Sequence, residues 1–179
     1  NAVAQANLAE CYEDGEGVEQ DEEKAFFWYK KAAEQGNAVG QLGTGICYED
    51  GEGVEQDLEQ AVYWYRKAAE QEYARAQSVL GCCYHNGDGV EQDYEQAVYW
   101  FREAIKQDDV VGQRNLGLCY ENGEGVEKDL EQAAYWYKEA AGQGDADAQY
   151  RLGMCYENGE GVEKDLEQAA YWYKEAAGQ

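Results

Sequence analysis

A four-residue string, Gly-Glu-Gly-Val, recurs along the chain and constrains its fold more than any other feature. It stands at residues 15–18, 51–54, 123–126 and 159–162, and Gly-Asp-Gly-Val takes its place at residues 87–90. The first glycines of successive copies are 36 residues apart. A fixed period between about 20 and 50 residues is the signature of stacked supersecondary units, each of which contacts only its neighbours. We therefore expect a repeat array.

The period accounts for the whole chain of 179 residues. We divide the chain into a single array of five units, residues 1–36, 37–72, 73–108, 109–144 and 145–179, with no separate domain and no linker. Because the chain begins at Asn1 and stops just before a fifth full unit is complete, we interpret it as a fragment or trimmed form of a longer protein.

Of all the features of the composition, the net charge says most about possible binding partners. The formal net charge is -24, from 38 acidic and 14 basic residues. Nucleic acids and anionic membranes bind proteins largely through Lys and Arg, so both are excluded as expected partners. No apolar run approaches the roughly 20 residues of a membrane-spanning helix. A basic or amphipathic polypeptide is the expected partner, because opposite charge accelerates encounter.

Each unit is predicted to hold two helices joined by a loop. In the first helix, Ala4, Leu8, Cys11 and Tyr12 recur at helical spacing. Asn or Asp stands at the expected N-cap in three later units, at Asn37, Asp109 and Asp145. This helix should end at the first glycine of the repeated string, because glycine adopts the left-handed conformation that other residues avoid.

The second helix has a sharper start signal than the first. An Asp is followed three residues later by Gln in four units, at Asp57/Gln60, Asp93/Gln96, Asp129/Gln132 and Asp165/Gln168. This is the spacing of a capping box, and in the first unit Lys24 replaces the Gln after Asp21. From there Ala25, Trp28 and Tyr29 begin one apolar face. Glycines in the first helix are expected to allow close helix packing, at Gly45, Gly81, Gly117 and Gly153.

At these residues the chain resembles the Sel1-like repeat family, which is related to tetratricopeptide repeats. The matching pattern, Ala-x-Ala-Gln-x-x-Leu-Gly-x-x-Tyr-x-x-Gly-x-Gly-Val followed by Asp and then Ala-x-x-Trp-Tyr-x-x-Ala-Ala, is complete in residues 146–177 and recurs five times. The resemblance implies an all-α fold, a right-handed α/α superhelix of five helix-turn-helix repeats. It also implies a scaffold for protein complexes, with the first helices lining the concave face.

The five units differ mainly in their first helices. Residues 117–143 and 153–179 are identical except that Leu118 is matched by Met154. Variation gathers at three places of the first helix: Val3, Val39, Arg75, Val111 and Asp147; Ala6, Leu42, Ser78, Arg114 and Tyr150; Glu10, Ile46, Cys82, Leu118 and Met154. At 100° per residue these places cluster within about 60°, opposite the Leu-Cys-Tyr face assigned to the core. They define a second face.

We predict that this second face binds a peptide, with an apolar row as anchors and acids one turn later that select a basic sequence. The predicted peptide-binding residues are Val39, Leu42, Ile46, Glu49, Arg75, Ser78, Cys82, His85, Val111, Arg114, Leu118, Glu121, Tyr150 and Met154. The alternative is that the apolar row packs between adjacent first helices. A further hypothesis is that Arg75, Arg114 and Arg151, with Asn115 nearby, hold a carboxylate, although such arginines more often pair with neighbouring acids.

A structural role without any cognate ligand is the competing hypothesis. The nearly identical last two units fit either a recent duplication or a consensus-like engineered array. Neither end unit has an evident polar capping helix, so both ends are expected to leave apolar faces bare and to self-associate.

Several residues that suggest chemistry are expected to have none. Cys11, Cys47, Cys83, Cys119 and Cys155 stand once per unit, too far apart for disulfides, and Cys82 is the one extra. With one histidine, His85, and no Cys-x-x-Cys, no metal or cofactor is expected. The Gly-acid-Gly loop lacks the lysine of a phosphate loop and the ligand spacing of an EF-hand. We predict no enzymatic activity, and thiols without disulfides favour a reducing compartment.

Overall fold

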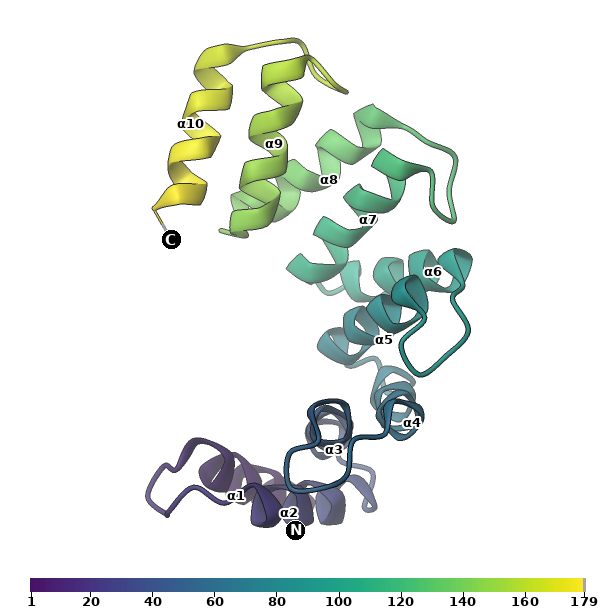
Figure 1. Ribbon diagram of the computed structural model, residues 1–179, viewed down its shortest axis with the longest axis vertical. Helices are drawn as coiled ribbons and strands as arrows, with labels where there is room; N and C mark the ends of the chain where they lie inside the picture. Colours follow the sequence, from purple (N-terminus) through teal and green to yellow (C-terminus); the bar gives the residue numbers. More distant parts are fainter. Residues whose placement is uncertain (179) are drawn as a thin grey trace. The chain divides into compact units, whose positions relative to one another are not determined.

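A computed structural model describes residues 1–178, which form ten α-helices and no strand (Figure 1). The first helices of the repeats are α1 (Ala2–Asp14), α3 (Ala38–Asp50), α5 (Ala74–Asn86), α7 (Val110–Asn122) and α9 (Ala146–Asn158). The second helices are α2 (Glu22–Ala33), α4 (Leu58–Ala69), α6 (Tyr94–Ile105), α8 (Leu130–Gly142) and α10 (Leu166–Ala177). The all-α fold and the helix-loop-helix repeat are confirmed.

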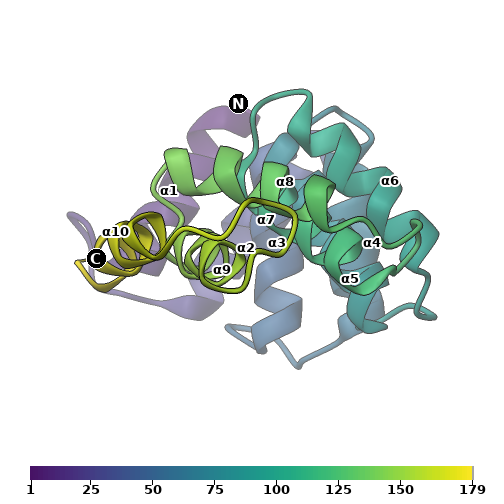
Figure 2. The same ribbon diagram turned by 90° about the horizontal axis from the view of Figure 1, so that it is seen from above.

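The chain divides into two compact units. Unit 1 is Asn1–Gln92 and holds α1 to α5, and unit 2 is Asp93–Gln179 and holds α6 to α10. Within each unit every helix packs on the next one in the chain, as Figures 1 and 2 show. An interior helix of a unit, such as α3, therefore contacts α4 of its own repeat on one side and α2 of the preceding repeat on the other.

The predicted helix starts and ends are confirmed at the level of hydrogen bonds. Asp57 caps α4 by accepting from the backbone N–H of Gln60 at 3.0 Å. In the first repeat Asp21 caps α2 in the same way, and Lys24 adds an ion pair to it at 2.7 Å. Each first helix ends at a left-handed glycine, with φ between 72° and 84°, whose N–H donates to a carbonyl of the last turn. Tyr73, before α5, makes no side-chain cap.

In the second, fourth and fifth repeats a tyrosine ring of the second helix packs directly against a glycine of the first. Tyr65 of α4 is fully buried, and a Cβ at Gly45 of α3 would lie 2.4 Å from its Cε1 atom. Tyr137 and Tyr173 lie on Gly117 and Gly153 in the same way. Gly45, Gly117 and Gly153 thus let the two helices approach closely, as predicted.

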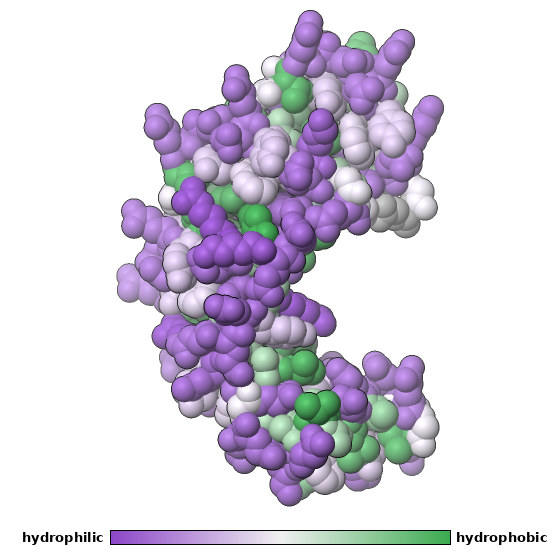
Figure 3. All heavy atoms as spheres, turned by 180° about the vertical axis from the view of Figure 1, so that it is seen from behind, coloured by the Kyte–Doolittle hydropathy of each residue, from purple (hydrophilic) through white to green (hydrophobic). Residues whose placement is uncertain are grey.

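Hydrophilic residues cover most of the face shown in Figure 3. The exposed large apolar side chains include one aromatic ring per second helix, each about half exposed: Phe27, Tyr63, Tyr99, Tyr135 and Tyr171. Each ring makes an edge contact with the tryptophan that follows it, such as Tyr63 with Trp64 at 5.1 Å between centroids.

Candidate functional site

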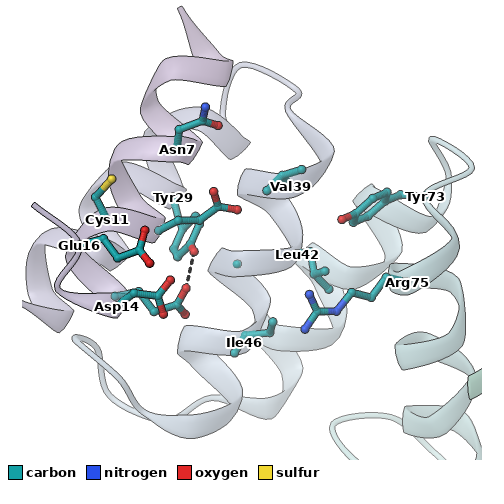
Figure 4. A pocket seen from close by; sticks show the side chains of 13 residues that line it. Asn7, Cys11, Asp14, Glu16, Tyr29, Val39, Leu42, Ile46, Tyr73 and Arg75 are labelled. Carbon is teal, nitrogen blue, oxygen red and sulfur yellow. Dashed lines mark hydrogen bonds between the residues drawn. The ribbon is translucent and has the colours of Figure 1, made fainter. Parts of the chain in front are cut away.

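Unit 1 contains a groove between the first helices of its repeats. Its volume is about 470 Å³, and side chains from α1, α3 and the start of α5 line it (Figure 4). The lining residues are Asn7, Glu10, Cys11, Glu13, Asp14, Glu16, Tyr29, Val39, Leu42, Gly43, Ile46, Tyr73 and Arg75. One side of this groove is apolar and the other is acidic, and we call it the acidic groove.

The apolar side of the acidic groove comes from α3. Val39 and Ile46 are half-buried, and Leu42 between them is only 3% exposed. All three line the groove from α3 (Figure 4). Val39 and Ile46 therefore present apolar surface to the groove, whereas Leu42 is covered.

The acidic side comes from the end of α1 and the loop that follows it. Glu10, Asp14 and Glu16 are exposed. Glu13 also lines the groove and accepts a hydrogen bond from the Tyr29 hydroxyl at 2.6 Å, which fixes its carboxylate in place. Carboxylates gathered at one wall focus a negative potential that favours cationic side chains.

Arg75 is the single basic residue of the acidic groove. It enters from α5 and points toward Ile46 and Leu42 in Figure 4. No ion pair holds its guanidinium in the described part of the chain. The Arg75 guanidinium therefore faces the groove opposite the acidic wall without an ion pair of its own.

The groove of unit 2 differs in charge. It has a volume of about 640 Å³ and lies between α7 and α9, lined by Arg114, Asn115, Leu118, Asp147, Tyr150, Arg151 and Met154. Arg114 pairs with Asp145 at 2.9 Å and with Asp147 at 3.2 Å, while Arg151 pairs with Glu121 at 3.1 Å. Both arginines are therefore paired with acids of the protein itself. Of the three arginines in the hypothetical carboxylate site, two are thus already neutralised.

The structure separates the predicted peptide-binding residues into groups. Val39, Leu42, Ile46 and Arg75 line the acidic groove, and Arg114, Leu118, Tyr150 and Met154 line the groove of unit 2. Val111, Cys82 and His85 are half-buried and line neither groove.

Ser78 was wrongly predicted to face a peptide. It is 1% exposed, and its hydroxyl donates to the Arg75 carbonyl of its own helix at 3.1 Å. The place it shares with Leu42 lies at the border of the buried face, where a short side chain is covered and only a long one such as Arg114 or Tyr150 emerges. A spacing of 100° per residue is too coarse to resolve that border.

Glu49 and Glu121 have a structural partner that the sequence interpretation missed. Each accepts a hydrogen bond from the buried tyrosine hydroxyl 16 residues later, Tyr65 and Tyr137 respectively. The equivalent places of the third repeat hold His85 and Phe101, which change together. This joint change of the acceptor and the tyrosine is the signal in the sequence that could have revealed the hydrogen bond. Burial and the neighbouring carboxylate both raise the pKa of the Tyr65 hydroxyl.

The cysteines behave as buried thiols. Cys47, Cys83, Cys119 and Cys155 are buried, and the six described cysteines form no disulfide. Burial raises the pKa of the Cys47 and Cys83 thiols to about 12, with a further contribution from nearby carboxylates such as Glu13 and Glu49. Their thiolates are scarce at neutral pH, so they are poor nucleophiles.

Thiol labelling should therefore distinguish the half-exposed cysteines from the buried ones by their rates of reaction. At pH 8 we expect the native protein to react rapidly at the half-exposed Cys11 and Cys82, and Cys47 and Cys83 to react at least about 100-fold more slowly, since a thiol with a pKa near 12 holds little thiolate. Mass spectrometry after timed alkylation, with urea-unfolded protein as control, measures this. Equal rates at Cys11 and Cys47 in the native protein would contradict the assignment.

The model of the family described as Sel1 repeat matches residues 2–37, 38–73, 74–109, 110–145 and 146–179. The chain belongs to the Sel1 repeat family. These boundaries lie one residue after those drawn from the glycine period. Sel1 repeat proteins are generally protein-interaction scaffolds and typically lack enzymatic activity.

Solved structures of Sel1 repeat proteins share the fold. A Sel1 repeat protein from Oxalobacter formigenes is 41% identical, with a TM-score of 0.95 over 99% of this chain and 71% of that one. The protective antigen c5321 of uropathogenic Escherichia coli is 38% identical, with a TM-score of 0.92 over 99% of this chain but 38% of that one. Cysteine-rich protein B of Helicobacter pylori is 31% identical, with a TM-score of 0.54 over 68% of this chain and 87% of that one. No curated protein matches the chain.

No group of three or more His, Cys, Asp or Glu side chains is placed to hold a metal ion within residues 1–178. Among the helices described, none combines the length and the apolar character needed to cross a membrane.

Proposed function

We propose that this Sel1 repeat protein binds a polypeptide segment in its first-helix grooves, and that the acidic groove selects a basic, amphipathic one. The observation that carries the proposal is the pairing of an apolar side, formed by the half-buried Val39 and Ile46, with a wall of carboxylates that includes Glu10 and Asp14. An amphipathic helix or extended segment presents the complementary pair of surfaces.

The two surfaces have different tasks in this proposal. The wall of carboxylates attracts Lys and Arg side chains from a distance and raises the rate of encounter. The apolar side then holds the segment, because burial of apolar area supplies most of the affinity while exposed charges add little. Affinity should therefore fall with added salt, yet remain measurable at high salt through the apolar contacts.

The test uses a fluorescent amphipathic peptide of Lys and Leu, with a Glu and Leu peptide of the same length and pattern as the control probe. We expect Ile46→Glu to weaken binding of the Lys/Leu peptide at least about 10-fold, although it adds a negative charge, because it removes an apolar anchor. Tyr63→Glu makes a comparable change on the half-exposed outer side of α4 and should leave affinity unchanged. Fluorescence anisotropy titration measures both.

A second pair of variants tests the acidic wall. The combined change Glu10→Gln and Asp14→Asn should weaken binding and flatten its salt dependence. The combined change Glu55→Gln and Glu59→Gln removes two exposed acids outside the groove and should do neither. An affinity untouched by Ile46→Glu in a folded protein, or equal effects of the two acid pairs, would overturn the proposal. Leu118→Glu reports on the groove of unit 2 in the same assay.

A further inference from the structure

Each second helix presents a pair of neighbouring aromatic rings set at nearly a right angle. In α8 the rings of Tyr135 and Trp136 lie 4.9 Å apart between centroids, with an interplanar angle of 78°. Tyr135 is 50% exposed although α8 packs on α7 and on α9 (Figure 1). The exposure is a property of the repeat, because Tyr63 of α4 is equally exposed between α3 and α5. We call such a pair of rings an aromatic corner.

In unit 1 the chain fills its aromatic corners with its own lysines. The Lys31 ammonium lies 4.5 Å from the centroid of Phe27 and 5.5 Å from that of Trp28, so one cation contacts both rings. In the next repeat the Lys67 ammonium lies 5.6 Å from the centroid of Tyr63. A cation is attracted by the negative face of an aromatic ring. An aromatic corner therefore accommodates a lysine side chain.

In unit 2 the place of that lysine, four residues after the exposed ring, holds an acid. It is Glu139 in α8 and Glu175 in α10, and both are exposed. Within residues 93–178 no Lys or Arg lies over Tyr135 or Tyr171, and neither glutamate forms an ion pair. These two aromatic corners thus leave the place of the cation open and add a carboxylate beside it.

Two further contacts decide which aromatic corners suit a cation. The Nε1 atoms of Trp136 and Trp172 are buried, so the half-exposed part of each indole is ring carbon and directs no N–H at a cation. In α6 the equivalent acid, Glu103, already pairs with Lys106 at 2.6 Å. The aromatic corners of α8 and α10 are therefore the ones that combine two rings with an unpaired acid.

We infer that the aromatic corners of α8 and α10 bind lysine side chains of a basic partner polypeptide. In each, the ammonium lies against the two rings, and the glutamate one turn later neutralises it. The occupant is a basic polypeptide rather than a second copy, because exposed carboxylates flank the rings and copies of net charge -24 repel one another. A segment with spaced lysines fills both places at once and gains from the second contact. These rings line neither groove, so the inference stands independently of the proposed function.

A fluorescent peptide of Lys and Ser is the probe, since it has no apolar residue for the acidic groove to hold. We expect Tyr135→Leu combined with Tyr171→Leu to weaken its binding at least about fourfold, because one exposed contact between a cation and a ring contributes about twofold to fivefold. Phe27→Leu combined with Tyr63→Leu is the matched control. It removes rings that already hold a lysine of the chain, so affinity should change less than about twofold. Both variants keep the net charge, and anisotropy titration measures both.

Competition with tetramethylammonium separates the rings from the acids. This cation binds aromatic faces, whereas sodium at the same ionic strength only screens charge. Tetramethylammonium chloride should therefore displace the Lys/Ser peptide more than sodium chloride does, and the difference should vanish in the variant with Tyr135→Leu and Tyr171→Leu. Equal displacement by the two salts in the parent, or equal losses in the two leucine variants, would overturn the inference. Self-association of the parent that this variant abolishes, seen by light scattering, would also overturn it in favour of a second copy.

A lysine placed in unit 2 gives the reciprocal test. Glu139→Lys should bring an ammonium over Tyr135, as Lys67 lies over Tyr63, and so close the aromatic corner of α8. Glu127→Lys makes the same change of charge at an exposed place of the preceding loop. We expect Glu139→Lys to weaken binding of the Lys/Ser peptide about threefold more than Glu127→Lys does. Equal effects would contradict a site at the rings, and far-UV circular dichroism confirms that each variant is folded.

Discussion

Replacing Gly53 with alanine should lower the free energy of unfolding by about 3 kcal/mol, and replacing Gly17 with alanine by about 1 kcal/mol. Both glycines occupy the same place in the loop and have left-handed φ values, 68° at Gly53 and 75° at Gly17. A Cβ is strained in that conformation at either position. Only at Gly53 does it also meet a neighbouring repeat.

The clash at Gly53 involves backbone rather than a movable side chain. The added Cβ would lie 2.2 Å from the Glu22 carbonyl oxygen and 2.5 Å from its carbon, so α2 and the loop must separate. Separation opens the interface between the first two repeats, which supplies much of the stability of an array. Overpacking of this kind typically costs about 1–3 kcal/mol beyond the backbone strain.

Urea unfolding followed by far-UV circular dichroism compares the two variants with the parent. Strain alone sets the loss at Gly17, so the difference between the two losses measures the contact between repeats. If Gly53→Ala and Gly17→Ala lost equal unfolding free energy, glycine would be needed only for the left-handed backbone of the loop and not for the contact with the neighbouring repeat.

The helices themselves were predictable because their signals are local. The Asp57 cap and the glycine at the end of α3 act within a few residues of chain, and the structure confirms both. The place of Ser78 was not predictable in the same way, because its burial depends on how neighbouring helices cover the border of a face. Local chemistry determines where a helix begins and ends, whereas exposure depends on tertiary packing.

The candidate site was predictable in part for the same reason. Ile46 was assigned to the variable face from its spacing alone, and it lines the acidic groove. Which charges remain available could not be inferred from spacing, since Arg114 is taken up by Asp145 and Asp147 while Arg75 is not. The two grooves differ both in these pairings and in their residues, since Asp147 and Leu118 of the second groove stand at the places of Val39 and Glu10 in the first.

Replacing Tyr65 with alanine should lower the free energy of unfolding by about 3–5 kcal/mol, the usual range for removing a buried aromatic ring. The ring is fully buried against Gly45. Tyr65→Phe keeps the ring and removes the hydrogen bond to Glu49, so it should cost about 2 kcal/mol. The two variants separate the packing of the ring from the bond of its hydroxyl.

A double-mutant cycle tests whether Tyr65 and Glu49 act as a pair. Glu49→Ala leaves the buried hydroxyl without its acceptor and should cost about as much as Tyr65→Phe, while the double variant should cost little more than either one. Additive losses would contradict the pairing. Tyr173→Phe is the matched control, since the same bond to Glu157 lies at the exposed last repeat, where water replaces it at a smaller cost.

The dependence of folding stability on alkaline pH gives a second test of the Tyr65–Glu49 hydrogen bond. The direction of the expected change follows from the pKa of Tyr65. Burial and the hydrogen bond to Glu49 raise the pKa of Tyr65 in the folded protein above its ordinary value of 10.0. Above that pH the unfolded chain releases the proton while the folded chain keeps it, so the stability present below pH 10 is lost as the pH rises. Tyr65→Phe removes this ionisation and should therefore lose less stability between pH 9 and pH 11 than the parent, measured from urea midpoints. If Tyr65→Phe and the parent lost stability equally with rising pH, water would have to reach the Tyr65 hydroxyl. Tyr65 would then hold α3 and α4 together through the ring contact alone.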